Sequence, residues 1–218
     1  MKTQTLLTGL RPGHDVERYR SRIEQFVAHQ SSYRPFVLIA DCQAIAEGSI
    51  RSAELEASVQ VTVEFLIDSG FDTGHAACFL QSQVPQLSEL ARMLEGVVGA
   101  SAGTQLACNA VRFPQSMSEV ADMLMLRPDL ILGGQGDRPD FEVATMVGRM
   151  IGGPFGRAAF HEVPVNDIQE EGSSERSLST TTGIADLLSY GGSAARIEAQ
   201  KSLELIRQRA GFNYAMFK

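Results

Sequence analysis

The sequence predicts an α/β protein with a doubly wound parallel sheet, because two apolar patterns alternate along the chain. Short runs of branched and aromatic residues at positions 36–40, 76–80 and 130–134 are typical of strands that are buried on both faces. The stretches 51–67 and 87–98 instead repeat apolar residues with helical spacing. This alternation of strand and helix implies right-handed crossovers, and therefore strands that run parallel.

The end of the chain has a different character. The polar stretch EEGSSERSLSTTT, residues 170–182, predicts a mobile surface loop. A short helix near residues 184–188, a break at SYGGS and a helix over about residues 194–209 should follow. We therefore expect a domain over residues 1–169, a loop over 170–182, and a helical tail over 183–218 that is too small to fold alone.

Composition excludes several classes of function. The net charge of −7 disfavours general nucleic-acid binding, and no apolar run approaches the ~20 residues needed to cross a bilayer. Cys42, Cys78 and Cys108 form no CxxC pair, and the four histidines show no metal-ligand spacing. We expect a cytoplasmic protein without a metal, a cofactor or a membrane partner.

Polar residues follow three of the predicted strands, at positions 41–43, 81–83 and 135–137. Because the carboxyl ends of parallel strands meet at one edge of a sheet, these residues could line a common pocket. The alternative is that they are ordinary solvent-facing loop ends. Asp122 stands out because it lies in the apolar helical pattern SEVADMLML, where a carboxylate must cap a helix, pair with Arg112 or Arg127, or receive a ligand donor.

Four ordered motifs resemble those of bacterial tryptophanyl-tRNA synthetases over about residues 3–168. FLQSQVPQLSELARML (79–94) is similar to the family segment F-x-Q-S-x-V-P-x-H-x-E-L, with Leu87 in place of the histidine. TGLRPG (8–13), IADCQAIA (39–46) and ADMLML (121–126) are similar to three further family motifs. The resemblance implies the Rossmann-like catalytic domain of a class I aminoacyl-tRNA synthetase, a short helical tail, and a homodimer. The apolar stretch 87–99 could cover the partner subunit.

Two family signatures are altered. Glu17 and Arg18 stand where the H-x-G-N/H signature has the glycine and asparagine that lie against ATP. The nearest match to K-M-S-K-S is SLSTT, residues 177–181, which lacks the lysines that stabilise the pyrophosphate. The helical domain that reads the tRNA anticodon is also missing from this resemblance. We therefore expect that ATP does not bind and that tRNA is not a partner.

The resemblance also implies an amino-acid pocket. In the family, the aspartate at the position of Asp122 accepts the indole N–H, which is a donor only. Arg11 falls where a glutamine meets the ligand carboxylate, and Glu119 or Asp137 could meet its ammonium group. The remaining expected ligand-binding residues are Leu7, Gly9, Ala40, Asp41, Gln43, Gln81, Leu132 and Gly134.

Three hypotheses follow. The first is a degenerate paralogue of tryptophanyl-tRNA synthetase that cannot form an adenylate and binds tryptophan or a related aromatic amino acid. It would act as a sensor or accessory module, with or without a protein partner. The second is an enzyme with a rebuilt active site for amino-acid transfer or other nucleotide-related chemistry. The third is a structural subunit with an empty pocket. The candidate catalytic residues of the second hypothesis are Arg11, His14, Asp15, Glu17 and Arg18.

Overall fold

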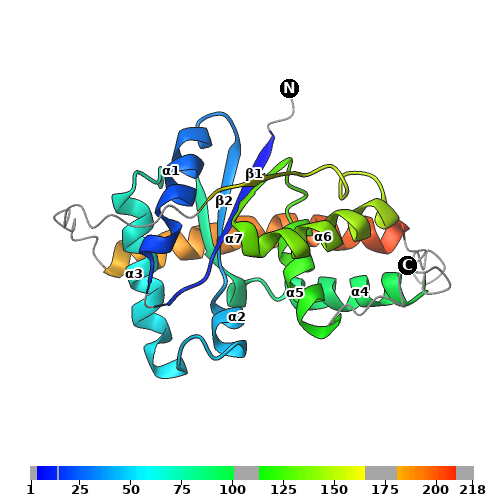
Figure 1. Cartoon of the computed structure of the whole chain (residues 1–218), viewed down its shortest axis with the longest axis horizontal. Helices are drawn as coiled ribbons and strands as arrows, with labels where there is room; N and C mark the ends of the chain where they lie inside the picture. The colour runs from blue at the N-terminus through cyan, green and yellow to red at the C-terminus, as the bar shows by residue number, and fades with distance from the viewer. Residues whose placement is uncertain (1–3, 14, 101–112, 165–180, 210–218) are drawn as a thin grey trace.

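A five-stranded sheet forms the centre of the computed structural model, which describes residues 4–13, 15–100, 113–164 and 181–209 (Figure 1). All strands run parallel in the order β3-β2-β1-β4-β5. Their bounds are β1 Thr5–Leu10, β2 Arg34–Ile39, β3 Ala77–Leu80, β4 Leu130–Gly133 and β5 Ala159–Glu162. The predicted parallel α/β class is confirmed, and β2, β3 and β4 lie where the apolar runs placed strands.

Seven α-helices connect and cover these strands within the described residues. Their bounds are α1 Arg20–His29, α2 Asp41–Ala46, α3 Leu55–Asp68, α4 Gln86–Ala100, α5 Phe113–Leu124, α6 Arg138–Ile151 and α7 Thr181–Arg209. Short 3₁₀ turns precede α1, α3, α4 and α6: η1 Glu17–Tyr19, η2 Ser52–Glu54, η3 Gln81–Gln83 and η5 Gln135–Asp137. The predicted helices at 51–67 and 87–98 correspond to η2 with α3 and to α4.

Alternate side chains of the central strands enter two separate cores. Leu6 and Leu10 of β1 pack in the cluster that includes α1 and α3, while Leu7 packs in the cluster that includes α4, α5 and α6. This alternation is the consequence of the two-residue period of a strand, and it requires apolar residues on both faces. It explains why the strands read as continuous apolar runs.

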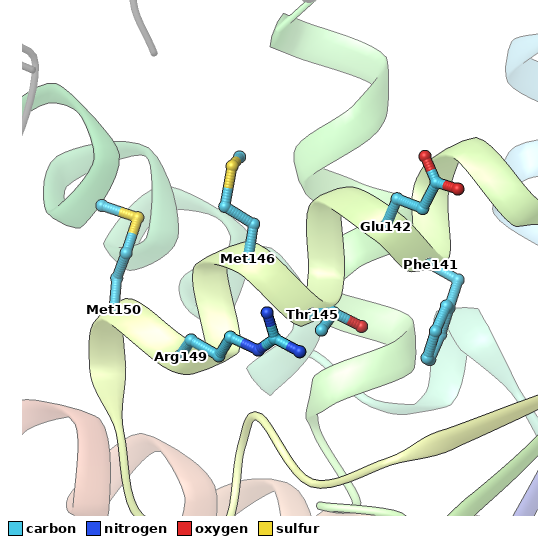
Figure 2. Close-up of a pocket in the computed structure, with 6 residues that line it drawn as sticks. All are labelled: Phe141, Glu142, Thr145, Met146, Arg149 and Met150. Carbon is cyan, nitrogen blue, oxygen red and sulfur yellow. The ribbon is translucent and has the colours of Figure 1, made fainter. Parts of the chain in front are cut away.

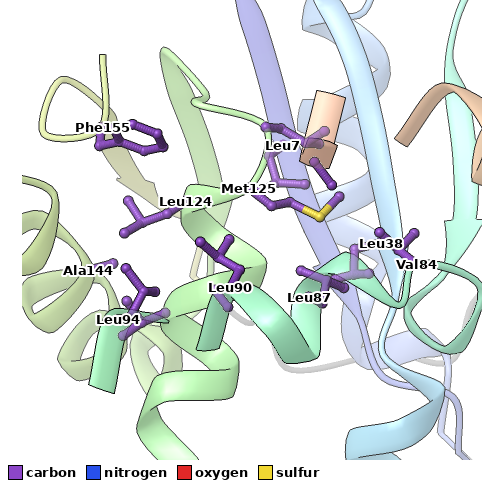
Figure 3. Packing of buried hydrophobic residues seen from close by; sticks show 14 of the residues in the cluster. Leu7, Leu38, Val84, Leu87, Leu90, Leu94, Leu124, Met125, Ala144 and Phe155 are labelled. Atoms are coloured by element: carbon purple, nitrogen blue, oxygen red, sulfur yellow. The ribbon is translucent and has the colours of Figure 1, made fainter. Parts of the chain in front are cut away.

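The apolar face of α4 is used inside this chain. Leu87, Leu90 and Leu94 are buried against residues of α5 and α6 such as Leu124 and Ala144 (Figure 3). Burial of each such side chain contributes roughly 1.5–3 kcal/mol. This stretch therefore has less apolar surface left to contact a partner subunit than the sequence indicates.

The predicted break at SYGGS is wrong, because α7 is one continuous helix from Thr181 to Arg209. Gly191 lies in it where the helix crosses the edge strand β3, and a Cβ at this position would come within 1.9 Å of the carbonyl oxygen of Cys78. A glycine pair usually weakens a helix, yet here Gly191 permits close packing of helix on strand. Figure 1 shows α7 running past β2 and β1 toward α6.

The loop and membrane expectations have different outcomes. Thr181 begins α7 although we expected it in the polar loop, and residues 170–180 of that loop lie outside the described residues. In the part of the chain that the structure describes, no helix is both long and apolar enough to span a membrane.

Candidate functional site

A cavity of about 560 Å³ opens at the carboxyl ends of β1 and β4. These neighbouring strands are joined to opposite halves of the sheet, since β2 and β3 continue on one side and β5 on the other. A crevice forms at such a switch point because the crossover connections leave it in opposite directions. Its volume lies in the range typical of small-molecule sites, about 300–1,000 Å³.

The floor of the cavity is apolar and built from strand residues. Leu7, Leu38, Ile131 and Leu132 line it together with small residues at the strand ends. Gly9 is one of these, and a Cβ there would meet nothing within 4 Å, so its lack of a side chain leaves open space. This composition suits a flat apolar ring.

Asp122 of α5 lines the cavity although it is only 6% exposed. Its Oδ2 accepts a 2.7 Å hydrogen bond from Nε2 of Gln81, whereas its Oδ1 has no partner among the described residues. Burial raises the pKa of Asp122 to about 8, against the opposing effect of the Gln81 hydrogen bond. A buried oxygen without a partner is costly, and a ligand donor would satisfy it.

A second acidic group lies one helical turn before Asp122. Glu119 accepts a hydrogen bond from the side-chain amide of Gln43, and it also shares a hydrogen bond with Asp140 of α6. Burial, the Asp140 hydrogen bond and the charge of Asp140 raise the pKa of Glu119 to about 7. Burial also raises the pKa of Asp140. Two carboxyl groups in this contact hold a proton between them.

Three arginines also line the cavity: Arg11, Arg18 and Arg22. Arg11 pairs with Glu47 at 2.6 Å, and Arg22 of α1 pairs with Asp137 at 2.8 Å while donating to the backbone oxygen of Gly9. Arg22 also fills the space beside Gly134, where a Cβ would lie 2.6 Å from its Nη2. Thus a guanidinium and its carboxylate partner occupy the end of the crevice between β1 and β4.

Arg18 lines the same cavity without a carboxylate partner among the described residues. It packs over the ring of Tyr19 at 4.7 Å and donates to the Tyr19 hydroxyl. That hydroxyl in turn accepts a hydrogen bond from the backbone N–H of Arg11. Tyr19 therefore holds the turn after β1 in place beneath Arg18.

Most residues predicted from the sequence come together here. Those that line the cavity are Leu7, Gly9, Arg11, Arg18, Ala40, Gln43, Glu119, Asp122, Leu132, Gly134 and Asp137. Asp41 and Gln81 do not line it: Asp41 accepts hydrogen bonds from Ser82, and Gln81 supports Asp122 from behind. Glu17 turns away and pairs with Arg20, Asp15 is exposed and does not line the cavity, and His14 lies outside the described residues.

Sequence reasoning missed three polar cavity residues: Tyr19, Arg22 and Asp140. Arg22 and Asp140 lie on amphipathic helices, where charged residues normally face solvent. Only the approach of α1 and α6 to the strand ends brings them inward. A glycine-rich strand end such as GGQG was the one available signal, since it leaves room for a long side chain.

A second concavity lies on the outer face of α6 (Figure 2). All six of its lining residues come from this one helix: Phe141, Glu142, Thr145, Met146, Arg149 and Met150. It lacks convergent polar groups from other elements, so we do not assign chemistry to it. The described residues contain no group of three or more His, Cys, Asp or Glu side chains that could hold a metal.

The parallel sheet and the crevice at its switch point define an α/β protein of the Rossmann type, with the ligand site at the carboxyl edge. Residues 21–163 match the family model "tRNA synthetases class I (W and Y)". The chain therefore belongs to the class I tRNA synthetase family for tryptophan and tyrosine.

Two curated relatives are tryptophan–tRNA ligases. The chain is 28% identical over 193 residues to tryptophan–tRNA ligase of Corynebacterium efficiens, covering 81% of this chain and 55% of the relative. It is 24% identical over 208 residues to tryptophan–tRNA ligase 2 of Streptomyces avermitilis, covering 84% and 61%. The chain thus spans a little over half the length of these relatives.

A solved structure supports the fold. The tryptophanyl-tRNA synthetase of Campylobacter jejuni complexed with ADP and tryptophan superimposes with a TM-score of 0.58 at 18% identity. The match covers 98% of this chain and 90% of that chain. At this identity the likeness shows the shared class I synthetase fold.

Proposed function

We propose that this chain binds tryptophan or a related indole-type amino acid in the cavity at β1 and β4, and that it does not form an aminoacyl-adenylate. The observation that carries the proposal is the buried Oδ1 of Asp122, which lacks a partner among the described residues and belongs to a residue lining an apolar cavity. An indole N–H is a donor without acceptor capacity, so it complements this oxygen. A ligand without the N–H would leave the oxygen unpaired.

The relatives support tryptophan as the ligand class. The two curated relatives above are named tryptophan–tRNA ligases, and the Campylobacter jejuni structure is described as complexed with tryptophan. The apolar floor with Leu7 and Leu132 is compatible with a bicyclic ring. The role we propose is that of a sensor or accessory module.

The loss of adenylate chemistry rests on charge and space. SLSTT carries no lysine to stabilise a leaving pyrophosphate. Arg22 and Asp137 pair across Gly134, at the crevice end where a Rossmann-type domain approaches a nucleotide. Glu17, which we expected to obstruct the nucleotide, pairs with Arg20 instead, so the obstruction we propose is the Arg22–Asp137 pair.

One observation favours the second hypothesis, an enzyme with a rebuilt site. Arg18 lines the cavity without a carboxylate partner among the described residues, so it could hold a phosphate or carboxylate of a co-substrate. Arg11 is less available because Glu47 already pairs with it. An activity of this kind would require a second ligand, which a binding assay with tryptophan alone does not supply.

We also propose the form in which the protein works: a homodimer in the cytoplasm, divided into a domain over residues 1–169, a loop and a helical tail. The support is the family membership. Sedimentation at several protein concentrations tests the dimer. A single monomeric species at micromolar concentration contradicts it.

Titration calorimetry with tryptophan tests the proposed function. We expect the wild type to bind tryptophan and Asp122→Asn to bind it at least about tenfold more weakly. With its oxygen held by the Gln81 amide, the asparagine would present an NH2 donor to the indole N–H in place of Oδ1. Asp186→Asn, an exposed change on α7, is the matched control and should bind like the wild type. Equal affinity of the wild type and Asp122→Asn contradicts the proposed role of Asp122.

A further inference from the structure

The polar wall of the cavity has more acid than base. The carboxyl groups that line it belong to Glu119, Asp122, Asp137 and Asp140. Two of the three lining guanidiniums already have protein partners, since Arg11 pairs with Glu47 and Arg22 with Asp137. The charge of Arg11 also acts on Glu119 of α5 and Asp140 of α6, but Arg11 is already paired with Glu47.

Glu119 and Asp140 meet across the α5–α6 contact and share a hydrogen bond. Such a contact holds because a proton lies between the two carboxyl groups. Gln43, from α2, donates its side-chain amide to Glu119 and so fixes one of the oxygens. The pair therefore forms a preorganised acceptor that carries one negative charge while it shares the proton and two once that proton leaves.

Asp122 gives an independent indication that this wall receives donors. It is nine-tenths buried, and its Oδ1 has no partner in the described part of the chain. Glu119 and Asp122 lie three residues apart on α5, hence on one face of the helix. No metal-binding group of three or more side chains is present among the described residues.

We propose that Glu119 and Asp140 bind the primary ammonium group of an aromatic ligand, and that the ammonium takes the place of the proton they share. This inference rests on the proposed function and makes it more specific. The amine of the ligand is the group that this pair recognises, whereas its carboxylate is left with Arg18 as its lining cation, because Arg11 and Arg22 are already paired. The displaced proton goes to solvent, and no covalent bond changes.

A pH dependence follows. The pKa of Glu119 is raised to about 7, so below that pH the shared proton competes with the ammonium. For one competing proton with this pKa, the affinity for an amine should rise about tenfold from pH 6 to pH 8. The other charged groups that face the pair are Asp122 on α5, Asp137 on η5, Arg11 after β1 and Glu47 after α2.

Three probes separate ammonium from carboxylate recognition by calorimetry: tryptophan, tryptamine, which lacks the carboxylate, and indole-3-propionate, which lacks the amine. We expect tryptamine to bind within about tenfold of tryptophan, because both present an ammonium group to the acidic wall, and indole-3-propionate at least about a hundredfold more weakly. Indole-3-propionate binding as tightly as tryptamine overturns the inference but leaves the proposed function standing. If none of the three binds, both fail.

Proton release identifies the pair. Titration of tryptamine at pH 7 in buffers of different ionisation enthalpy measures the protons released per ligand bound. Glu119→Gln and Asp140→Asn should each lower that number and flatten the pH dependence that remains. Glu142→Gln, an exposed change on α6, is the matched control and should leave both unchanged. Unaltered proton release in both Glu119→Gln and Asp140→Asn overturns the inference, even if their affinity falls.

Discussion

Gln81 donates a 2.7 Å hydrogen bond to Oδ2 of Asp122 and leaves Oδ1 of the same carboxyl without a partner among the described residues. Its own Oε1 accepts the backbone N–H of Gln43, so the Gln81 amide is held at both ends. Gln81 thereby fixes the orientation of Asp122 without lining the cavity itself. Gln81 is therefore a positioning residue for Asp122.

Replacement of Gln81 by methionine tests the positioning role. Gln81→Met removes the hydrogen bond that lowers the pKa of Asp122, so the pH at which Asp122 ionises should rise. Tryptophan affinity at pH 7 should fall about three- to tenfold, as expected for the loss of about 1 kcal/mol. Calorimetry over pH 6–9 measures both, with the exposed change Gln200→Met on α7 as control. An unchanged pH profile contradicts the positioning role.

Asp122 should also make stability depend on pH. Its folded pKa of about 8 lies above the ordinary 3.8. Between about pH 4 and pH 8 the carboxyl is therefore ionised in the unfolded state but protonated in the folded state, so the free energy of unfolding falls as pH rises. Asp122→Asn cannot ionise. The free energy of unfolding of the variant minus that of the wild type should therefore increase by up to about 1.4 kcal/mol per pH unit in that window. Urea unfolding at pH 5 and pH 8 measures the difference. A difference that is equal at both pH values contradicts the raised pKa.

Glu198 should have the opposite pH dependence. Burial alone would raise its pKa, but hydrogen bonds and charges from Arg34 and Lys201 lower it to about 2. The ion pairs of Glu198 are therefore fully present above about pH 4.5 and are lost as pH falls through about 2. Glu198→Gln should lower the free energy of unfolding by about 3 kcal/mol at pH 7, and by less as pH falls below about 4.

The matched control for Glu198 is Glu204→Gln, an exposed change on the same helix α7. Exposed charge pairs contribute little to stability, so this variant should stay within about 0.5 kcal/mol of the wild type. A loss of equal size in the two variants would refute the buried ion-pair explanation.

Gly191 and Gly96 test the packing of α7. Gly191→Ala should lower the free energy of unfolding by roughly 1–3 kcal/mol, because its Cβ would collide with the Cys78 carbonyl. Gly96→Ala, within α4 and with nothing within 4 Å of the added Cβ, should raise it by about 0.5–1 kcal/mol. Thermal or urea unfolding compares the two. Stabilisation by both changes contradicts the close contact of α7 with β3.

The sequence allows the sheet to be predicted because β2 and β3 must be apolar on both faces, and this local requirement is visible in the residues. The sequence does not predict that the helix continues through Gly191. The close packing that this glycine permits depends on contact with Cys78, a residue more than a hundred positions away. The strand β5 also lacks the apolar signal, since its residues alternate between exposed and half-buried.

The candidate site divides in the same way. Asp122 could be found because a carboxylate within an apolar helical pattern conflicts with its surroundings. Arg22 and Asp140 could not, because their surface-like positions on α1 and α6 become cavity positions only through the approach of distant strands. Their ion pair and proton-sharing contact are properties of the assembled fold.

The central claim is that the pocket survives while adenylate formation does not, and tryptophan-dependent exchange of labelled pyrophosphate into ATP tests it most directly. A preparation shown by calorimetry to bind tryptophan should give no exchange above the enzyme-free blank. The segment SLSTT contains no lysine to stabilise pyrophosphate, and Arg22 pairs with Asp137 at the crevice end. Exchange that requires tryptophan and disappears in Asp122→Asn would contradict the account.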